Sequence, residues 1–207
     1  MARLTRTETQ ARTRAELLAT ARDLFLTEGY AKTSLERVAE EAGYSKGAVY
    51  SNFKTKSALG LEVIELIHET KFGEAGELLE GGGTLEERLG RFQSWAEHTL
   101  GDVGWTMLEF EFAIVAREDP ALQAGLISSL SIVRGAIAAQ LQSLADSMEL
   151  TLPLPPEDAA NAILGLGVGL GIMRAIDPSI SAQLITDAVR EMFGGALRPA
   201  GPAVAGA

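Results

Sequence analysis

Residues 34–53, SLERVAEEAGYSKGAVYSNF, decide the fold of this chain. Two short apolar patterns with helical spacing flank Gly43 in this stretch. The first pattern puts small or branched apolar residues on one helix face, namely Leu35, Val38, Ala39 and Ala42. The second puts Val49 and Phe53 four residues apart, so that both can pin a short helix to the core. The turn between them needs a residue that tolerates positive φ, which Gly43 supplies. We therefore predict a helix-turn-helix over residues 34–53.

The second helix of this motif has the composition of a helix that enters a DNA groove. Ser45 is predicted to cap it, with Tyr44 filling the core beneath the turn. Gly47 and Ala48 are small enough to let the helix approach base edges. Thr33 and Glu36 form a candidate capping box for the preceding helix. The candidate DNA contacts are the polar and small residues in and around the motif, namely Thr33, Ser34, Ser45, Lys46, Gly47, Ala48, Tyr50, Ser51, Asn52, Lys54 and Lys56.

Helical periodicity continues through the rest of the chain, and no strand-like alternation competes with it. Thr13 and Glu16 are a candidate capping box for a helix that ends at Gly29, and an earlier start is also open. An apolar series from Leu122 to Met148 predicts one helix of about 29 residues. We predict an all-α fold with a three-helix N-terminal domain over residues 8–56. A C-terminal bundle of about six helices follows over residues 57–197, and a disordered tail over 198–207.

Charge is distributed unevenly along the chain. Residues 1–56 carry 10 Lys/Arg and 7 Asp/Glu, giving 10 − 7 = +3, whereas residues 57–207 carry 8 and 21, giving 8 − 21 = −13. An acidic body repels polyanions, so we expect nucleic-acid contacts only in the N-terminal domain. The chain has no cysteine, which excludes disulfides, thiolate metal sites and a cysteine nucleophile. The longest apolar run, residues 162–173, is shorter than the ~20 residues that span a membrane, so we predict a cytoplasmic protein. We expect no cofactor.

An ordered string of residues in the N-terminal domain resembles the DNA-binding domain of TetR-family transcriptional regulators over about residues 14–61. The string consists of Phe25, Gly29, Tyr30, Thr33, Ser34, Ala39, Ala42, Gly43, Ser45, Lys46, Gly47, Tyr50, Phe53, Lys56 and Leu59. Residues 109–122 are also similar to the sixth and seventh helices of many members. Asn52 departs from the histidine frequent in the family, and it retains the ability to bond a phosphate. The resemblance implies a non-enzymatic homodimeric regulator, most often a repressor, that binds a palindromic operator and pairs through its last two long helices.

The resemblance also implies a small-molecule effector bound in the C-terminal domain. The candidate pocket residues are bulky side chains and one carboxylate, namely Trp95, Trp105, Met107, Glu109, Phe110, Phe112 and Met173. The helix around residues 105–117 is apolar on more than one side, so we predict that it is central. Glu109 and Glu111 on such a helix favour a largely apolar effector that is cationic or donates hydrogen bonds. The alternatives are ordinary core packing and a structural ion pair of Glu109 with Arg134 or Arg174.

Four glycines in the segment Gly165–Gly171 cost helix stability and indicate a close approach. That approach is either at the dimer seam or within the chain at the pocket floor. His68 and His98 are predicted to be exposed, and no metal site is expected. Two other functions stay open: a helical ligand-binding protein or enzyme with an incidental helix-turn-helix, and a regulator controlled by a partner protein. The operator, the effector and the sign of regulation are not determined by these patterns.

Overall fold

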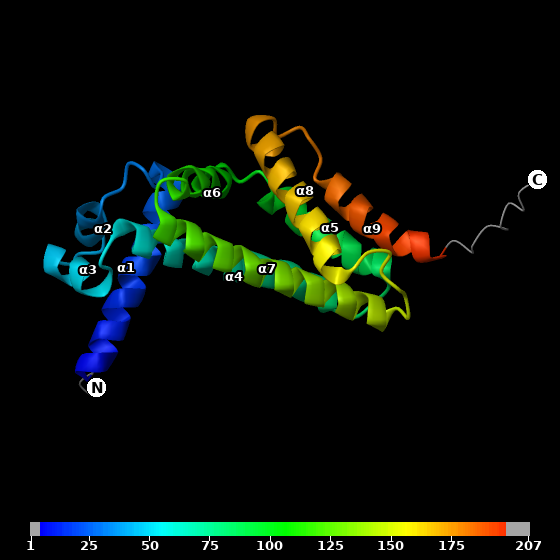
Figure 1. The fold of residues 1–207 in the computed structure, drawn as a ribbon, viewed down its shortest axis with the longest axis horizontal. Helices are drawn as coiled ribbons and strands as arrows, with labels where there is room; N and C mark the ends of the chain where they lie inside the picture. Colours follow the sequence, from blue (N-terminus) through cyan, green and yellow to red (C-terminus); the bar gives the residue numbers. More distant parts are fainter. Residues whose placement is uncertain (1–4, 198–207) are drawn as a thin grey trace, which may run out of the picture. The chain divides into compact units, whose positions relative to one another are not determined.

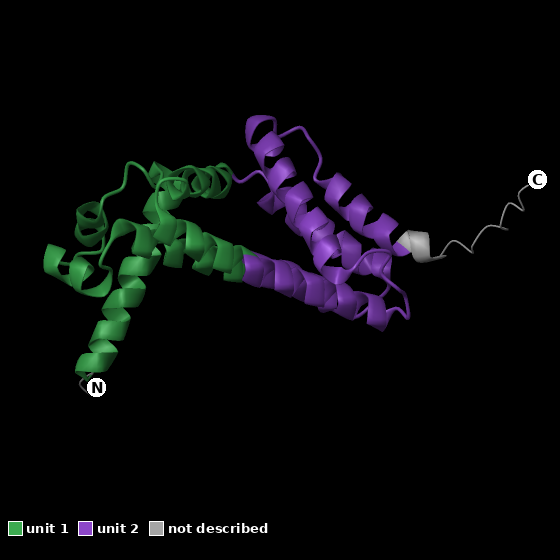
Figure 2. Ribbon diagram, viewed as in Figure 1, with its two compact units in different colours: residues 1–70, 103–130 green, residues 71–102, 131–207 purple. Residues whose placement is uncertain are grey.

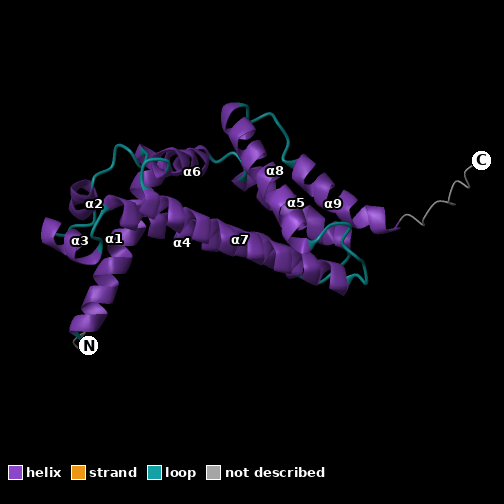
Figure 3. Ribbon diagram, viewed as in Figure 1, coloured by secondary structure: helices purple, strands orange, loops and turns teal. Residues whose placement is uncertain are grey.

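The computed structural model describes residues 5–197, which form nine α-helices and contain no strand (Figure 1, Figure 3). This confirms the predicted all-α class. The helices are α1 Arg6–Glu28, α2 Leu35–Glu41, α3 Lys46–Asn52, α4 Lys56–Glu80, α5 Leu85–Thr99, α6 Val103–Ala116, α7 Pro120–Ser147, α8 Pro156–Ile176 and α9 Gln183–Leu197. The predicted tail at 198–207 lies outside the described residues.

The chain forms two compact units, and each is built from two separate stretches of sequence (Figure 2). Unit 1 comprises residues 1–70 and 103–130, and unit 2 comprises residues 71–102 and 131–207. Helices α4 and α7 therefore contribute residues to both units. The predicted boundary between residues 56 and 57 lies at the start of α4, inside unit 1.

Helix α1 begins seven or eight residues before the proposed Thr13 cap. Its N-cap is Thr5, whose hydroxyl accepts from the Glu8 backbone N–H while the Glu8 carboxylate accepts from the Thr5 N–H. This reciprocal pair satisfies backbone donors that a helix start otherwise leaves open. Gly29 ends α1 with a φ of 90°, as predicted. Thr84 and Glu87 form a second capping box, at the start of α5.

The core of unit 1 is aromatic where α1, α4 and α6 meet. Tyr30 packs edge-on against Phe25 and lies 4.4 Å from Phe112, measured between ring centroids. Gly60 on α4 makes this packing possible. A β-carbon at Gly60 would lie 2.8 Å from the Tyr30 ring and closer still to the ring of Phe112. Only a residue without a side chain lets α4 come this close to α6.

Unit 2 is organised around a buried arginine. Arg174 on α8 donates to the backbone carbonyls of Glu97, Leu100 and Ile180, and its guanidinium pairs with the Glu97 carboxylate at 2.8 Å. These bonds join the end of α5 to the turn between α8 and α9. The apolar residues Ile185, Val189 and Phe193 bury the inner face of α9.

Helices α7 and α8 are long and apolar enough, by length and composition, to cross a membrane. The apolar run at residues 162–173 therefore understates the apolar length of these helices, because a window of 18 residues in each helix passes this test. The same length and composition occur in core helices of soluble proteins, and both helices bury part of their surface inside the protein.

Candidate DNA-binding surface

The helix-turn-helix forms at the predicted place. Helix α2 is capped by Ser34, whose hydroxyl accepts from the Arg37 backbone N–H at 3.0 Å. Gly43 has a φ of 74°, and the Tyr44 N–H closes the turn onto the Ala39 carbonyl at 2.8 Å. Ser45 caps α3 by accepting from the Ala48 N–H. Local backbone chemistry thus fixes both helices of the motif.

Thr33 does not have the role that the sequence suggested. The cap of α2 is Ser34, and Thr33 is only 1% exposed. Its hydroxyl donates inward to the Gly29 carbonyl at 2.9 Å. The prediction of a Thr33 cap was therefore wrong, and a buried hydroxyl that already donates is not available to a DNA phosphate.

Helix α3 has one buried face and one open face. Val49 is fully buried and Phe53, directly after the helix, is nearly so, as the spacing of these two residues predicted. The residues Lys46, Gly47, Tyr50 and Ser51 are exposed, and Ala48 is half-buried. The helix is held to its unit by Val49 and Phe53 and presents small and polar groups outward. This arrangement suits insertion into a groove.

A carboxylate lies beside the open face of α3. The Glu36 Oε1 atom on α2 accepts from the Tyr50 hydroxyl at 2.9 Å and lies 3.7 Å from the Lys46 Nζ atom. The pKa of Glu36 is lowered, first by its own backbone N–H and then by Tyr50. Glu36 therefore stays ionised and occupies two side chains that were predicted to contact DNA. Nothing in the local sequence pattern signalled this contact, because Glu36 was assigned only to a capping box.

The two lysines after α3 differ. Lys54 is exposed. Lys56 bends inward, where its Nζ donates to the Ala31 carbonyl at 3.1 Å and lies 4.2 Å from the centre of the Tyr30 ring. Burial lowers the pKa of Lys56, and the negative charge of Glu111 partly opposes this effect. In this conformation Lys56 stabilises unit 1 and does not extend toward a ligand.

Arg14 fastens the end of α3 to α1 and α4. Its guanidinium donates to the Asn52 carbonyl at 2.5 Å, pairs with both oxygens of Glu62 at 2.5 and 2.6 Å, and lies 4.3 Å above the Phe53 ring. The Asn52 side chain donates to the Ala48 carbonyl. The sequence interpretation counted Arg14 only as positive charge, since its partners lie 38 and 48 residues away.

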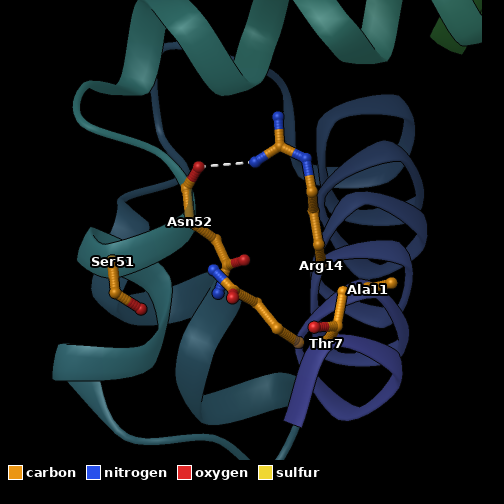
Figure 4. Close-up of a pocket in the computed structure, with 6 residues that line it drawn as sticks. Thr7, Ala11, Arg14, Ser51 and Asn52 are labelled. Carbon is orange, nitrogen blue, oxygen red and sulfur yellow. Dashed lines mark hydrogen bonds between the residues drawn. The ribbon is translucent and has the colours of Figure 1, made fainter. Parts of the chain in front are cut away.

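A pocket of about 330 Å³ opens between α1 and the end of α3 (Figure 4). It is lined by Thr7, Gln10, Ala11, Arg14, Ser51 and Asn52. In the close-up, Arg14 reaches across to the Asn52 carbonyl, and Thr7 and Ser51 belong to opposite walls.

The seven candidate effector residues are divided between the two units. Trp95 and Met173 belong to unit 2, where the Trp95 indole N–H donates to Glu74. The others lie on α6 in unit 1, namely Trp105, Met107, Glu109, Phe110 and Phe112. Phe112 is a core residue against Tyr30. The prediction that α6 is central was wrong for one face of the helix, because Val103, Met107, Phe110 and Ile114 are exposed.

Glu109 has a partner that the sequence did not suggest. Its Oε1 atom lies 2.9 Å from the His68 Nε2 atom and accepts from the Trp105 indole at 2.8 Å. The other ring nitrogen of His68 lies 3.1 Å from the Ser129 hydroxyl. His68 is 6% exposed, so the prediction of an exposed histidine was wrong. His98 is exposed, as predicted.

Neither proposed arginine reaches Glu109. Arg134 pairs with Glu157 at 3.0 Å, and Arg174 pairs with Glu97. Glu111 accepts from the Ala31 backbone N–H at 2.9 Å and so has a structural partner of its own. Within the described residues, no group of three or more His, Asp or Glu side chains is arranged to hold a metal ion.

The glycines of α8 do not share one role. A β-carbon at Gly165 or Gly169 would meet nothing within 4 Å, whereas one at Gly167 would contact Ile185 on α9 at 3.5 Å. Close packing within the chain therefore does not explain Gly165 and Gly169. They share an open face of α8 with Val168, Met173 and Ile176, which are exposed.

The fold and the motif define a helix-turn-helix protein of the bacterial regulator type. Residues 17–63 match the family model described as "Bacterial regulatory proteins, tetR family". The N-terminal part of the chain thus carries a DNA-binding domain like that of TetR-family transcriptional regulators.

Curated relatives agree with this assignment. The transcriptional regulator AcrR of Shigella flexneri is 45% identical over 74 residues, which cover 36% of this chain and 34% of AcrR. The chain therefore matches about a third of the length of that relative. The transcriptional repressor AcnR of Corynebacterium glutamicum is 24% identical over 144 residues, covering 70% of this chain and 72% of AcnR.

Among solved structures, a TetR-family regulator from Mesorhizobium loti has the same fold. Its TM-score is 0.68 at 21% identity, and the match covers 94% of this chain and 98% of that protein. This likeness extends the fold assignment over both units.

Proposed function

We propose that this chain is a DNA-binding transcriptional repressor that places α3 in a major groove. The observation that carries the proposal is the two-faced α3, with Val49 buried and Lys46, Gly47 and Tyr50 exposed, inside the segment that matches the TetR family. Lys46, Gly47 and Ala48 approach base edges. The phosphate contacts are Ser34, Ser45, Tyr50, Ser51, Asn52 and Lys54. Thr33 and Lys56 act through the fold instead.

The test is selection of a duplex from a random-sequence library, followed by titration of variants. Lys46→Ala combined with Tyr50→Ala should weaken binding to the selected duplex by tenfold or more, since one good base contact contributes about 1–3 kcal/mol. The melting temperature should change little, because both side chains are exposed. Unchanged affinity of the double variant would overturn the assignment of α3.

The repressor acts as a homodimer through α8 and α9. Support comes from the open apolar face of α8 around Gly165 and Gly169 and from the exposed Leu184 on α9. Small residues without neighbours allow a second α8 to approach closely. A twofold dimer would present two copies of α3 to half-sites at least ~34 Å apart on a palindromic operator.

A small-molecule effector releases the operator, with α6 among the elements that contact it. Support comes from the exposed Met107 and Phe110 and the half-buried Glu109 on that helix. The carboxylate favours a largely apolar molecule that is cationic or donates hydrogen bonds. A thermal-shift screen against metabolites would identify binders, and Glu109→Gln should then weaken binding of a cation by more than tenfold. Because Glu109 also bonds His68, the melting temperature of the Glu109→Gln variant must first be compared with that of the wild type. As a regulator of transcription, the protein would work in the cytoplasm.

A further inference from the structure

The first two turns of α1 extend away from the core of unit 1. No residue before Leu17 is buried in the described part of α1, and residues 5–12 are all exposed. Isolated helical turns gain little stability in water, and most helical stability in proteins comes from packing. The Thr5–Glu8 capping box keeps this segment helical without a core. A helix end kept ordered in this way has an ordered surface to offer to a partner.

That surface forms one wall of the pocket beside α3. Their spacing of three and four residues places Thr7, Gln10 and Ala11 on one face of α1. Figure 4 shows Ser51 and Asn52 on the wall that faces Thr7 and Ala11. None of the six lining residues is acidic. The Thr7 and Gln10 side chains are exposed. A hydroxyl and an amide can donate to a ligand that accepts hydrogen bonds.

The position of the pocket indicates which acceptor it meets. Helix α3 has seven residues, a length of about 10 Å, and the major groove is about 12 Å wide. When such a helix lies across the groove, its two ends reach the sugar-phosphate backbones at the edges. Ser51 and Asn52 form the C-terminal end of α3, and Thr7 and Gln10 continue the same surface outward.

We propose that this pocket is a phosphate notch, which receives one backbone phosphate of the DNA strand that flanks the C-terminal end of α3. Thr7 and Gln10 donate to the phosphate oxygens, and Arg14, whose charge is paired with Glu62, fixes the wall by holding the Asn52 carbonyl. The inference rests on the proposed DNA-binding function and extends the contact surface from the helix-turn-helix to α1. Because the donors are neutral and touch the backbone, the notch contributes affinity and register but no base preference.

The test uses the full-length protein, the duplex it selects from a random library, and a mixed-sequence duplex of equal length. Thr7→Ala combined with Gln10→Ala should weaken binding to both duplexes by about 3- to 10-fold, the range expected for one or two lost hydrogen bonds. The slope of log affinity against log salt should not change, because no charge is removed. Alanine favours the helix, so loss of helicity would not explain the result.

A substitution that should increase affinity for DNA tests the notch more sharply. Gln10→Lys should tighten binding to both duplexes and steepen the salt slope by about 0.9, as one additional phosphate contact predicts. The matched control is Thr9→Lys, which places the same charge on the opposite, exposed face of α1. Thr9→Lys should give less than half of the gain in affinity and less than half of the change in the salt slope.

Two outcomes separate the notch from the function on which it rests. If Lys46→Ala with Tyr50→Ala abolishes binding while the Thr7 and Gln10 variant binds like wild type, DNA binding stands and the notch is wrong. Equal effects of lysine at positions 9 and 10 would overturn the notch in the same way. If the wild-type protein selects no duplex, the proposed function fails, and the notch fails with it.

Discussion

The Tyr50 hydroxyl on α3 donates to the Glu36 carboxylate on α2 at 2.9 Å, and the Lys46 ammonium lies 3.7 Å from the same oxygen. A DNA phosphate offers the same chemistry to these two side chains: negative oxygens that accept hydrogen bonds. If Tyr50 and Lys46 contact phosphate as proposed, Glu36 would compete with the DNA backbone for both side chains. It would then lower the affinity for every duplex.

Glu36→Gln should strengthen DNA binding. Glutamine keeps an acceptor for Tyr50 and removes the charge that attracts Lys46 and repels phosphate. We expect roughly a two- to fivefold gain in affinity at low salt for selected and mixed-sequence duplexes alike, declining as salt screens the interaction. Fluorescence anisotropy titrations measure the gain, with Glu40→Gln, an exposed carboxylate of the same helix, as the control. Weaker binding by Glu36→Gln would mean that the carboxylate positions Tyr50 instead.

Arg14→Lys should destabilise unit 1 although the charge is kept. Lysine cannot donate to the Asn52 carbonyl and both oxygens of Glu62 while lying flat on Phe53. Charge-assisted bonds at this partly exposed site suggest a loss of about 1–2 kcal/mol in the free energy of unfolding. Urea denaturation measures the loss. Arg12→Lys, whose exposed side chain pairs only with Glu16, should have little effect. Equal losses of stability in Arg14→Lys and Arg12→Lys would show that Arg14 contributes no more than an exposed arginine.

Two glycines of α4 should respond in opposite ways to alanine. Gly60→Ala places a methyl group against the Tyr30 and Phe112 rings and should cost about 1–3 kcal/mol of stability by overpacking. Gly73→Ala meets nothing within 4 Å and should stabilise by about 0.5–1 kcal/mol, because alanine favours the helix. Thermal unfolding of both variants checks the pair. A stable Gly60→Ala would show that α4 can shift away from α6 at no cost.

The stability of unit 2 should fall in acid through Glu97. Its pKa lies below the ordinary 4.5, first because the Ser181 hydroxyl bonds the carboxylate and further because the Ala182 N–H and Arg174 do so. A lowered folded-state pKa contributes stability above pH 4.5, and that contribution disappears as pH falls below this value. Urea midpoints at pH 7 and below 4.5 should therefore differ less in Glu97→Gln than in wild type. Ser181→Ala should reduce the difference partly. Identical pH dependence in all three proteins would contradict the role of Glu97.

Val168→Arg should convert the protein into monomers. Val168 is exposed between Gly165 and Gly169, so an arginine there would place charge and bulk in the proposed seam. Light scattering at micromolar concentration measures the mass. Ser143→Arg, on the exposed surface of α7, is the control and should leave the dimer intact. A dimer that persists in Val168→Arg would place the seam elsewhere.

Sequence was most informative where structure depends on neighbours along the chain. The cap at Ser45 and the turns at Gly29 and Gly43 follow from local backbone chemistry, and they were predicted correctly. The contacts of side chains whose partners lie far away in the sequence were not predicted. His68 looked like an exposed polar residue because Glu109 and Ser129, which bury it in hydrogen bonds, lie 41 and 61 residues away.

The same limit applies to the DNA-binding surface. Lys56 has the charge and the sequence position expected of a phosphate contact, yet its side chain turns inward to the Tyr30 ring and the Ala31 carbonyl. Glu36 looked like part of a capping box, and its contact with Tyr50 depends on how α3 crosses α2. Spacing along one helix predicts which residues share a face, but not which charges of the next helix oppose them.

The hydrogen bonds of the buried Arg174 also constrain when unit 2 can fold during synthesis. The Glu97 and Leu100 carbonyls at the end of α5 receive their hydrogen bonds from a residue made 74 to 77 positions later. At about 5–20 residues per second, the ribosome needs on the order of 4–15 seconds to add that arginine. During that interval the end of α5 lacks its arginine partner. The nascent chain cannot complete this part of unit 2 until α8 has left the exit tunnel, and a chaperone that binds apolar segments can act in the meantime.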